Sequence, residues 1–292
     1  MSGRWPRPSL EEVQVRASTV GRTVLLRDLT TLRIGGPAEL WEVEGSEELA
    51  EATRRPYRIL GGGSNLLVSD SGVPERVVKL GRSFSTLEAL DGSVEPWVGA
   101  ATPLPGLVRR AQRLGLSGLE GLLGIPGVVG GAVVMNAGTR FGSIADVLTE
   151  VGLYLEGRSV RLPVAEVGFG YRSSELPPGA VVTKARFRLV PSTPERVAKA
   201  MEAPDEARRG QPKIKSAGCA FKNPPHDSAG HIIDLHGLKG LRVGDAMVSH
   251  EHGNFIVNLG NATSTEVLRL IDEIRSRIDI PLQMEWHLWG QP

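Results

Sequence analysis

Cysteine is almost absent from this chain, and its scarcity excludes two kinds of site. Cys219 is the one cysteine among 292 residues, so neither an intrachain disulfide nor a cysteine-based zinc site can form. Histidine is also scarce, and the six His residues show no metal-ligand spacing on an evident helix. We therefore expect no metal centre and no metal-assisted catalysis.

Long apolar runs and an excess of charge of one sign are missing too. No apolar segment has the length needed to span a bilayer, and residues 1–8 lack the apolar core of a signal peptide. The net charge of +1 gives no basic stripe for nucleic acid or for an anionic membrane. We expect a cytoplasmic protein that binds a small molecule, with no nucleic-acid, membrane or obligate protein partner.

Glycine, in contrast, is abundant, and the chain is organised around the first of two glycine-rich stretches. Gly61, Gly62, Gly63, Ser64 and Asn65 separate two apolar runs, each the length of a buried strand. Glycine backbone can turn tightly and let successive N–H groups converge on a phosphate, and Ser64 and Asn65 add side-chain donors. Because a strand rather than a helix follows, this is not a Rossmann fingerprint. A plain turn and a pyrophosphate-binding loop both fit the pattern.

The second stretch, at 118–138, is apolar but so interrupted by glycine that no single helix or strand could use it all. Its central part contains Gly124, Ile125, Pro126, Gly127, Gly130 and Gly131. Close packing between layers would need such a sequence, and so would a flat aromatic cofactor lying across exposed N–H groups. Two such stretches in one chain favour the cofactor.

The remaining sequence predicts a mixture of helices and strands, and therefore an α+β protein of two or three domains. Helices are expected at 46–55, at 104–114 with Thr102 as N-cap, from a linker at 191–194 to about 209, at 229–235 and at 264–278. Strands are expected in hairpins at 86–99, with Asp91 and Gly92 in the turn, and at 148–162, and singly at 180–189, 255–259 and 282–289. Residues 1–22 are expected to form a polar tail or an edge helix.

Five sequence blocks, taken in order, resemble one family. They are 59–68, 124–131, 169–174, 217–224 and 254–258, and they resemble the UDP-N-acetylenolpyruvoylglucosamine reductases over most of the chain beyond about residue 28. The resemblance implies a two-subdomain FAD-binding fold of the vanillyl-alcohol-oxidase or PCMH-like type at 1–80 and 81–190. An α+β substrate domain would follow at 191–292. Because 191–209 is short, the chain resembles the subgroup that lacks a long Tyr-containing substrate loop.

The resemblance also implies a reaction. A bound FAD, reduced by NADPH, would pass hydride to the enolpyruvyl ether of UDP-N-acetylglucosamine and give UDP-N-acetylmuramate for peptidoglycan synthesis. The loop at 61–65 would then lie at the FAD pyrophosphate, and 124–131 alongside the pyrophosphate and flavin, with N–H groups as donors where side chains would obstruct.

Three catalytic residues follow from the resemblance. Arg172 and Glu285 match the family's pair at the substrate carboxylate, where an enolate develops and needs a cation or a hydrogen-bond donor. Glu285 stands alone among apolar residues, where burial raises the pKa of a carboxyl. Cys219 occupies the position at which many members have Ser as the proton donor. A thiol with an ordinary pKa of about 8.5 would bring sensitivity to alkylation and oxidation.

Substrate binding is assigned to Tyr171, Asn223, Arg209 and Lys213. Gly210 stands where family members often carry Lys, so Arg209, Lys213 or Lys215 would have to contact the substrate diphosphate. Two other functions remain open: a flavoprotein oxidase of the same fold, and a nucleotide-binding module without catalysis. A cysteine hydrolase has little support, because no His is marked as a base for Cys219.

Overall fold

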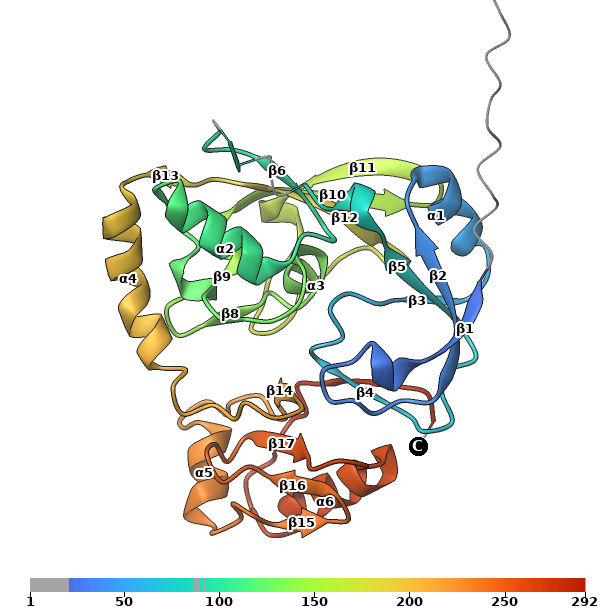
Figure 1. Cartoon of the computed structure of the whole chain (residues 1–292), viewed down its shortest axis with the longest axis vertical. Helices are drawn as coiled ribbons and strands as arrows, with labels where there is room; N and C mark the ends of the chain where they lie inside the picture. Colours follow the sequence, from blue (N-terminus) through green and yellow to red (C-terminus); the bar gives the residue numbers. More distant parts are fainter. Residues whose placement is uncertain (1–20, 87–89, 92, 292) are drawn as a thin grey trace, which may run out of the picture.

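The computed structural model describes residues 21–86, 90–91 and 93–291. The expected tail or helix at 1–20 and most of the turn in the expected 86–99 hairpin, Gly92 included, lie outside the described residues. The described chain contains three four-stranded sheets, two in the upper part of the molecule and one in the lower part (Figure 1). The prediction of an α+β protein is confirmed.

The first sheet carries the glycine-rich loop at 61–65. In spatial order its strands are β1 (Arg22–Leu25), β2 (Pro37–Val43), β5 (Arg76–Leu80) and β3 (Tyr57–Ile59). β1 is antiparallel to β2, whereas β2, β5 and β3 run parallel, with helix α1 (Ser46–Ala52) connecting β2 to β3. The loop therefore leaves the carboxyl edge of parallel strands, which is where ligands bind in open sheets of this kind.

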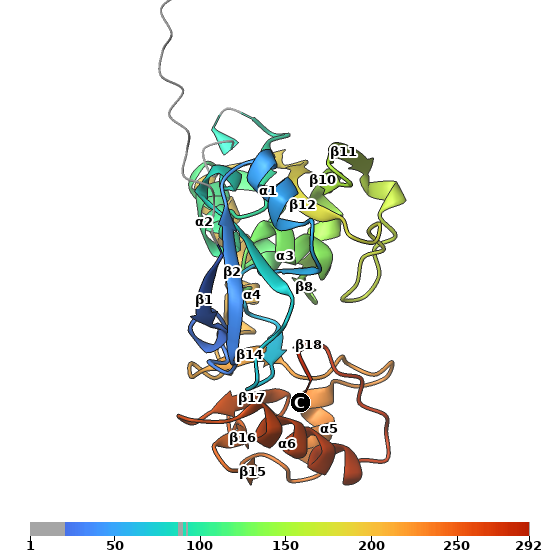
Figure 2. The same cartoon turned by 90° about the vertical axis from the view of Figure 1, so that its right-hand side faces the viewer.

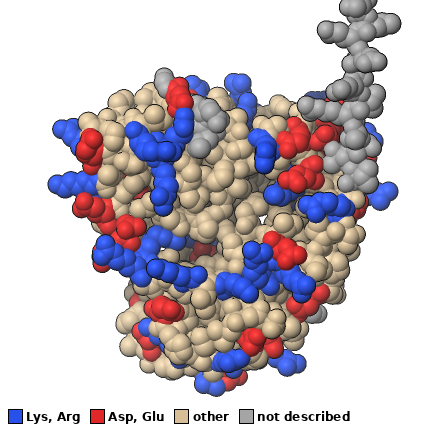
Figure 3. Space-filling view, in the orientation of Figure 1, with Lys and Arg blue, Asp and Glu red and all other residues tan. Residues whose placement is uncertain are grey.

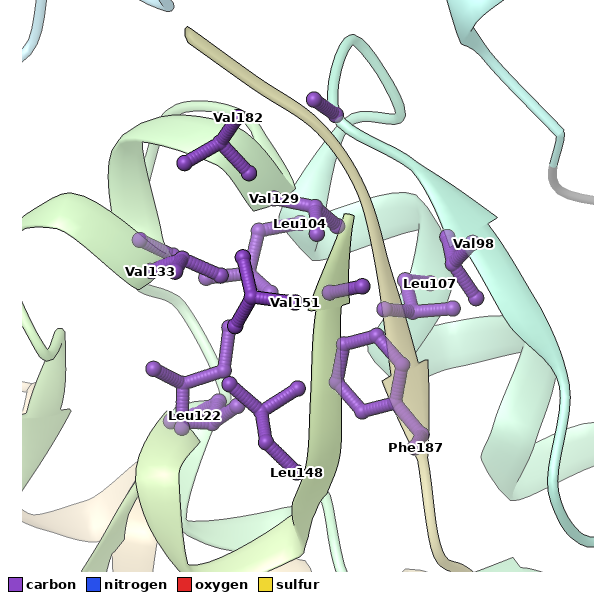
Figure 4. Close-up of a cluster of buried hydrophobic side chains, with 14 of the residues drawn as sticks. Val98, Leu104, Leu107, Leu122, Val129, Val133, Leu148, Val151, Val182 and Phe187 are labelled. Atoms are coloured by element: carbon purple, nitrogen blue, oxygen red, sulfur yellow. The ribbon is translucent and has the colours of Figure 1, made fainter. Parts of the chain in front are cut away.

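The second sheet is antiparallel and forms the largest core. Its spatial order is β11 (Arg158–Pro163), β10 (Leu148–Leu155), β12 (Val181–Phe187) and β6 (Trp97–Gly99), so the expected hairpin at 148–162 is confirmed. Helices α2 (Leu104–Arg113) and α3 (Val129–Val134) pack against it. Figure 4 shows Leu107 and Val133 from these helices with Val151 and Phe187 from the sheet. Each such buried side chain contributes about 1.5–3 kcal/mol.

The third sheet forms the lower part of the molecule. Its antiparallel strands, in spatial order, are β14 (Ser216–Cys219), β17 (Phe255–Asn258), β16 (Ala246–Val248) and β15 (Arg242–Val243). Helices α5 (Ala229–Leu235) and α6 (Ser264–Ser276) pack on it, and Figure 2 shows both on one side of the strands. α6 begins as predicted, with Thr263 and Glu266 forming a capping box.

The C-terminal segment joins the third sheet to the first. Glu285 N donates to Ala220 O at 2.9 Å, and β18 (His287–Trp289) then pairs in parallel with β4 (Leu66–Val68). The prediction of one continuous strand at 282–289 was wrong, because the two halves of this segment pair with different parts of the chain. Glu285 lies at the crossing point between them.

Helix α4 (Pro194–Glu206) stands beside α2 (Figure 1), and its Val197 and Met201 are buried in the core of the second sheet. Thr193 caps it by accepting a hydrogen bond from Arg196 N at 3.3 Å. From the end of α4 the chain crosses to β14, which ends at Cys219. The helix therefore sets where residues 207–215 enter the junction between the upper and lower parts.

The remaining elements are short. β7 (Leu116–Ser117) pairs with β13 (Val190–Pro191), β8 (Gly138–Thr139) pairs with β9 (Gly142–Ser143), and 3-10 helices cover Leu26–Asp28, Arg82–Phe84, Glu120–Leu122, Ile144–Val147 and Val164–Glu166. One predicted cap was wrong: the N-cap of α2 is Pro103, whereas Thr102 is fully buried and its hydroxyl accepts a hydrogen bond from Thr86 N at 3.0 Å.

Candidate active site

The two glycine-rich stretches meet backbone to backbone. A Cβ on Gly62 would lie 2.5 Å from the Cα of Gly127, a distance that real side chains do not adopt, so only glycine fits at 62. The hydroxyl of Ser64 lies next to the same loop and donates to Pro126 O at 3.4 Å. Tertiary contact thus brings together the two stretches that the sequence singled out.

The first loop keeps its backbone donors available. The N–H groups of residues 61–65 donate to no other residue in the described part of the chain. Free N–H groups in a glycine-rich turn can form an anion-binding concavity, so the residues present fit a pyrophosphate. Gly130 serves another purpose, because a Cβ there would lie 2.9 Å from that of Ala100. Close packing accounts for this glycine.

Arg172 and Glu285 form an ion pair at the crossing point of the C-terminal segment. Arg172 Nε donates to Glu285 Oε1 at 3.1 Å, and its Nη2 donates to Gly138 O at 2.7 Å. The side chains are only 21% and 14% exposed. Burial raises the pKa of Glu285, and the charge and hydrogen bond of Arg172 oppose that rise. The two catalytic candidates are therefore adjacent, and their ion pair lies in a largely dry environment.

Asn65 connects this pair to the first glycine-rich loop. Its amide Nδ2 donates to Glu285 O at 3.1 Å, and its backbone oxygen accepts from His287 N at 3.1 Å. Its Nδ2 also lies 3.5 Å from the sulfur of Met135. The sequence indicated Asn65 as a cofactor ligand, whereas in the described structure its amide binds the backbone of a catalytic candidate.

Cys219 lies within electrostatic range of the same pair. Burial, followed by the charge of Glu285, raises the pKa of the Cys219 thiol to about 12, while Arg172 and Arg208 oppose the rise. The thiol is therefore protonated at neutral pH and can act as an acid. Alkylation requires the thiolate, which this environment disfavours, so we expect Cys219 to react more slowly than an ordinary thiol.

Arg208 is the site residue that the sequence analysis missed. It is half-buried, and a Cβ on Gly124 would lie 2.4 Å from its Nε, so its side chain extends over the second glycine-rich loop. Arg209, which the sequence analysis chose, is 70% exposed and pairs with Glu206 at 2.5 Å. The helical periodicity could have indicated Arg208. Positions 197, 201 and 204 are buried, and position 208 continues the same face of the helix.

The other substrate candidates fall into two groups. Asn223 N donates to Tyr171 Oη at 3.4 Å, so these two residues are adjacent, while Asn223 Oδ1 accepts from Ala229 N at 3.1 Å. Lys213 and Lys215 instead line an open pocket of about 430 Å³ together with Gly62 and Arg33. Figure 3 shows Lys and Arg side chains around a hollow between the upper and lower parts, with an acidic side chain at its bottom.

Two kinds of feature are lacking in the part of the chain that the structure describes. It contains no cluster of three or more His, Cys, Asp or Glu side chains arranged to hold a metal ion. Nor does any described helix combine the length and apolar character that crossing a membrane requires.

Two family models match the chain. Residues 211–288 match the UDP-N-acetylenolpyruvoylglucosamine reductase C-terminal domain, and residues 37–160 match an FAD binding domain. The second match contains both glycine-rich stretches, and the first contains Cys219 and Glu285.

Full-length proteins and a solved structure are similar as well. The chain is 58% identical over 266 residues to the UDP-N-acetylenolpyruvoylglucosamine reductase of Thermus thermophilus, covering 91% of this chain and 98% of that one. It is 52% identical over 276 residues to the enzyme of that name from Deinococcus radiodurans, covering 92% and 95%. The crystal structure of the Thermus caldophilus reductase matches with a TM-score of 0.88 and 57% identity, covering 92% and 99%.

Proposed function

The chain belongs to the UDP-N-acetylenolpyruvoylglucosamine reductase family, and we propose how its residues carry out the family's reaction. The enzyme is an FAD-dependent oxidoreductase that reduces the enolpyruvyl ether of UDP-N-acetylglucosamine to UDP-N-acetylmuramate, a peptidoglycan precursor. FAD, when bound, would supply the hydride chemistry that links NADPH to the methylene carbon of the substrate. One observation carries the residue assignment: Arg172, Cys219 and Glu285 come from three separate segments and meet beside the two glycine-rich loops.

The glycine-rich loops are the proposed FAD site. Residues 61–65 would hold the pyrophosphate with backbone N–H groups that donate to no other described residue. Gly124, Ile125, Pro126, Gly127 and Gly131 would follow the cofactor from pyrophosphate to flavin, with Gly130 supporting them by packing. The first two sheets support FAD subdomains at 1–80 and 81–190, and the third sheet supports a substrate domain within 191–292. Within that last range α4 packs on the second sheet and β18 pairs with β4.

Arg172 is proposed to bind the substrate carboxylate. Hydride addition places negative charge on the neighbouring carbon and its carboxylate, so a fixed cation there stabilises the transition state more than the substrate. The bonds from Nε to Glu285 and from Nη2 to Gly138 O fix the guanidinium and leave Nη1 for the substrate. Glu285, when protonated in its buried position, donates a further hydrogen bond to the developing charge.

Cys219 is proposed to complete the reaction by protonating the enolate carbon. The S–H bond breaks as the new C–H bond forms, and solvent returns a proton to the thiolate afterwards. A raised pKa makes the Cys219 thiol a weaker acid. The enolate carbon is nevertheless a stronger base than the thiolate, so proton transfer from sulfur to carbon remains favourable. The same raised pKa keeps the thiol protonated, and so able to donate, throughout the physiological pH range.

Tyr171, Asn223 and Lys213 are proposed to bind other parts of the substrate. Tyr171 and Asn223 are adjacent to each other, and Lys213 lines the neighbouring pocket. Both nucleotides of the reaction are cytoplasmic metabolites, so we place the enzyme in the cytoplasm.

A net charge of +1 supports small-molecule rather than nucleic-acid or membrane partners, and the reaction needs no obligate protein partner.

The test is an anaerobic titration of the purified holoenzyme followed by its visible spectrum. NADPH should bleach the oxidised-flavin absorbance, and UDP-N-acetylglucosamine enolpyruvate should restore it. Bleaching that only oxygen reverses would identify an oxidase with another substrate. Binding of nucleotide without any bleaching would identify a module without catalysis. In the Cys219→Ala variant, unchanged flavin reoxidation would refute the proton-donor role.

A further inference from the structure

We propose that Arg208 binds the diphosphate of the nucleotide-sugar substrate; this inference rests on the function proposed above. Arg208 is a half-buried cation without a carboxylate partner among the described residues. Removing a cation from water is costly unless an anion or several acceptors compensate. An arginine held in this way at a ligand site is therefore prepared for an anionic ligand.

The position of Arg208 follows from helix α4. The helix is anchored by Val197 and Met201 in the core, and a backbone bond from Arg208 N to Asp205 O at 3.1 Å continues the last turn. Arg208 therefore faces inward, and its Nε and Cδ occupy the space that any side chain at Gly124 would need. The position of the Arg208 side chain is therefore fixed by helix α4 and by the glycine-rich loop at Gly124, unlike that of a freely exposed side chain.

The location distinguishes between the anions that the enzyme must bind. The substrate carboxylate already has Arg172, which is paired with Glu285. The FAD pyrophosphate is assigned to residues 61–65, whose contacts with the second loop include Pro126, Gly127 and Val128. Arg208 lies at the Gly124 end of that loop and within electrostatic range of Cys219. Since the substrate carboxylate and the FAD pyrophosphate have other binding groups, we assign Arg208 to the substrate diphosphate.

The chemistry of the side chain suits this ligand. A guanidinium presents parallel N–H donors that match two phosphate oxygens, whereas an ammonium acts as a point charge. Arg208 thus supplies the diphosphate contact that Gly210 cannot. Arg209 provides a control in the next position, because it has the same side chain but is exposed and already paired with Glu206.

The experiment measures binding of UDP to the FAD-loaded enzyme by titration calorimetry, with uridine as the phosphate-free probe. Arg208→Ala should raise the Kd for UDP about 10- to 100-fold, the effect of losing a charged hydrogen bond. The Kd for uridine should not change, and Arg208→Lys should give an intermediate Kd for UDP. Arg209→Ala should stay within about twofold of wild type, as expected for an exposed ion pair.

Several outcomes would overturn the assignment. A Kd for UDP unchanged by Arg208→Ala, or raised equally by Arg209→Ala, would remove the specific role. Loss of FAD from Arg208→Ala, with UDP affinity restored by added FAD, would assign the residue to the cofactor. Wild-type holoenzyme that binds UDP but does not turn over the enolpyruvyl sugar would refute the proposed function, while leaving the Arg208 assignment to be decided by the same Kd values.

Discussion

The side-chain amide of Asn65 donates a hydrogen bond of 3.1 Å to the backbone carbonyl of Glu285, 220 residues away along the chain. Two residues later His287 N donates to the backbone oxygen of Asn65, so one residue of the glycine-rich loop holds the chain on both sides of Trp286. The geometry of the cofactor loop and the position of the catalytic carboxyl are thereby coupled.

Asn65→Asp tests this coupling, because Asp keeps the size of the side chain but cannot donate to the carbonyl. We expect kcat per bound flavin to fall about tenfold or more, since a small displacement of a catalytic group is costly. Flavin content is measured from the visible spectrum and kcat from NADPH oxidation. If FAD is lost while kcat per bound flavin is unchanged, Asn65 serves the cofactor and does not position Glu285.

The stability of the enzyme should depend on the pH through Glu285. Burial raises the pKa of this carboxyl, so its contribution to folding is fully present below its ordinary value of 4.5 and is lost as the pH rises through the raised value. Glu285→Gln remains neutral, so the free energy of unfolding of wild type should fall relative to that of the variant as the pH rises above 4.5, and the difference should level off above the raised pKa. Urea denaturation of the holoenzymes measures both curves.

The exposed Glu47, in the first turn of α1, provides the matched control. Glu47→Gln should not reproduce the pH-dependent difference, because this side chain has no burial to relieve. Parallel stability curves for wild type and Glu285→Gln would show that the buried carboxyl does not contribute in this way.

Cys219 should react slowly with alkylating agents. With its pKa raised from 9.0 to about 12, the thiolate fraction at pH 8 is about 10³-fold lower than for an unperturbed thiol. Iodoacetamide labelling of the native enzyme should be slower than labelling of the urea-unfolded chain by a factor of that order. Equal labelling rates in the native and unfolded states would contradict the raised pKa of the thiol.

Asp70 should stabilise the junction between the first and third sheets. Its carboxylate accepts hydrogen bonds from Ser264 N at 2.9 Å and from Ser264 Oγ at 2.8 Å, at the beginning of α6. Asp70→Ala should lower the free energy of unfolding by about 1–2 kcal/mol, as expected when hydrogen bonds to a charged group are lost and the first N–H group of a helix is left without its acceptor. Asp272→Ala, on the exposed surface of the same helix, should change it by less than about 0.5 kcal/mol in urea denaturation.

Much of the local structure followed from the sequence. The N-terminal boundary of α6, both ends of α5 and the hairpin of β10 and β11 were predicted from periodicity and turn residues, which act over a few neighbouring positions. The final strand was not, because the residues before Glu285 pair with 220–222 and those after it pair with β4. Strand partners that lie so far away along the chain leave no pattern in the local sequence.

The sequence by itself determined which residues could carry the chemistry. It marked the two glycine-rich stretches and, through the family blocks, Arg172, Cys219 and Glu285, because glycine spacing and unusual polar residues remain visible in a linear chain. Only the tertiary structure showed that Arg208 lies over the second glycine-rich loop while Arg209 is exposed, and that the surroundings of Cys219 raise the pKa of its thiol. Burial and electrostatic environment depend on which segments pack together, so neither property belongs to any one stretch of sequence.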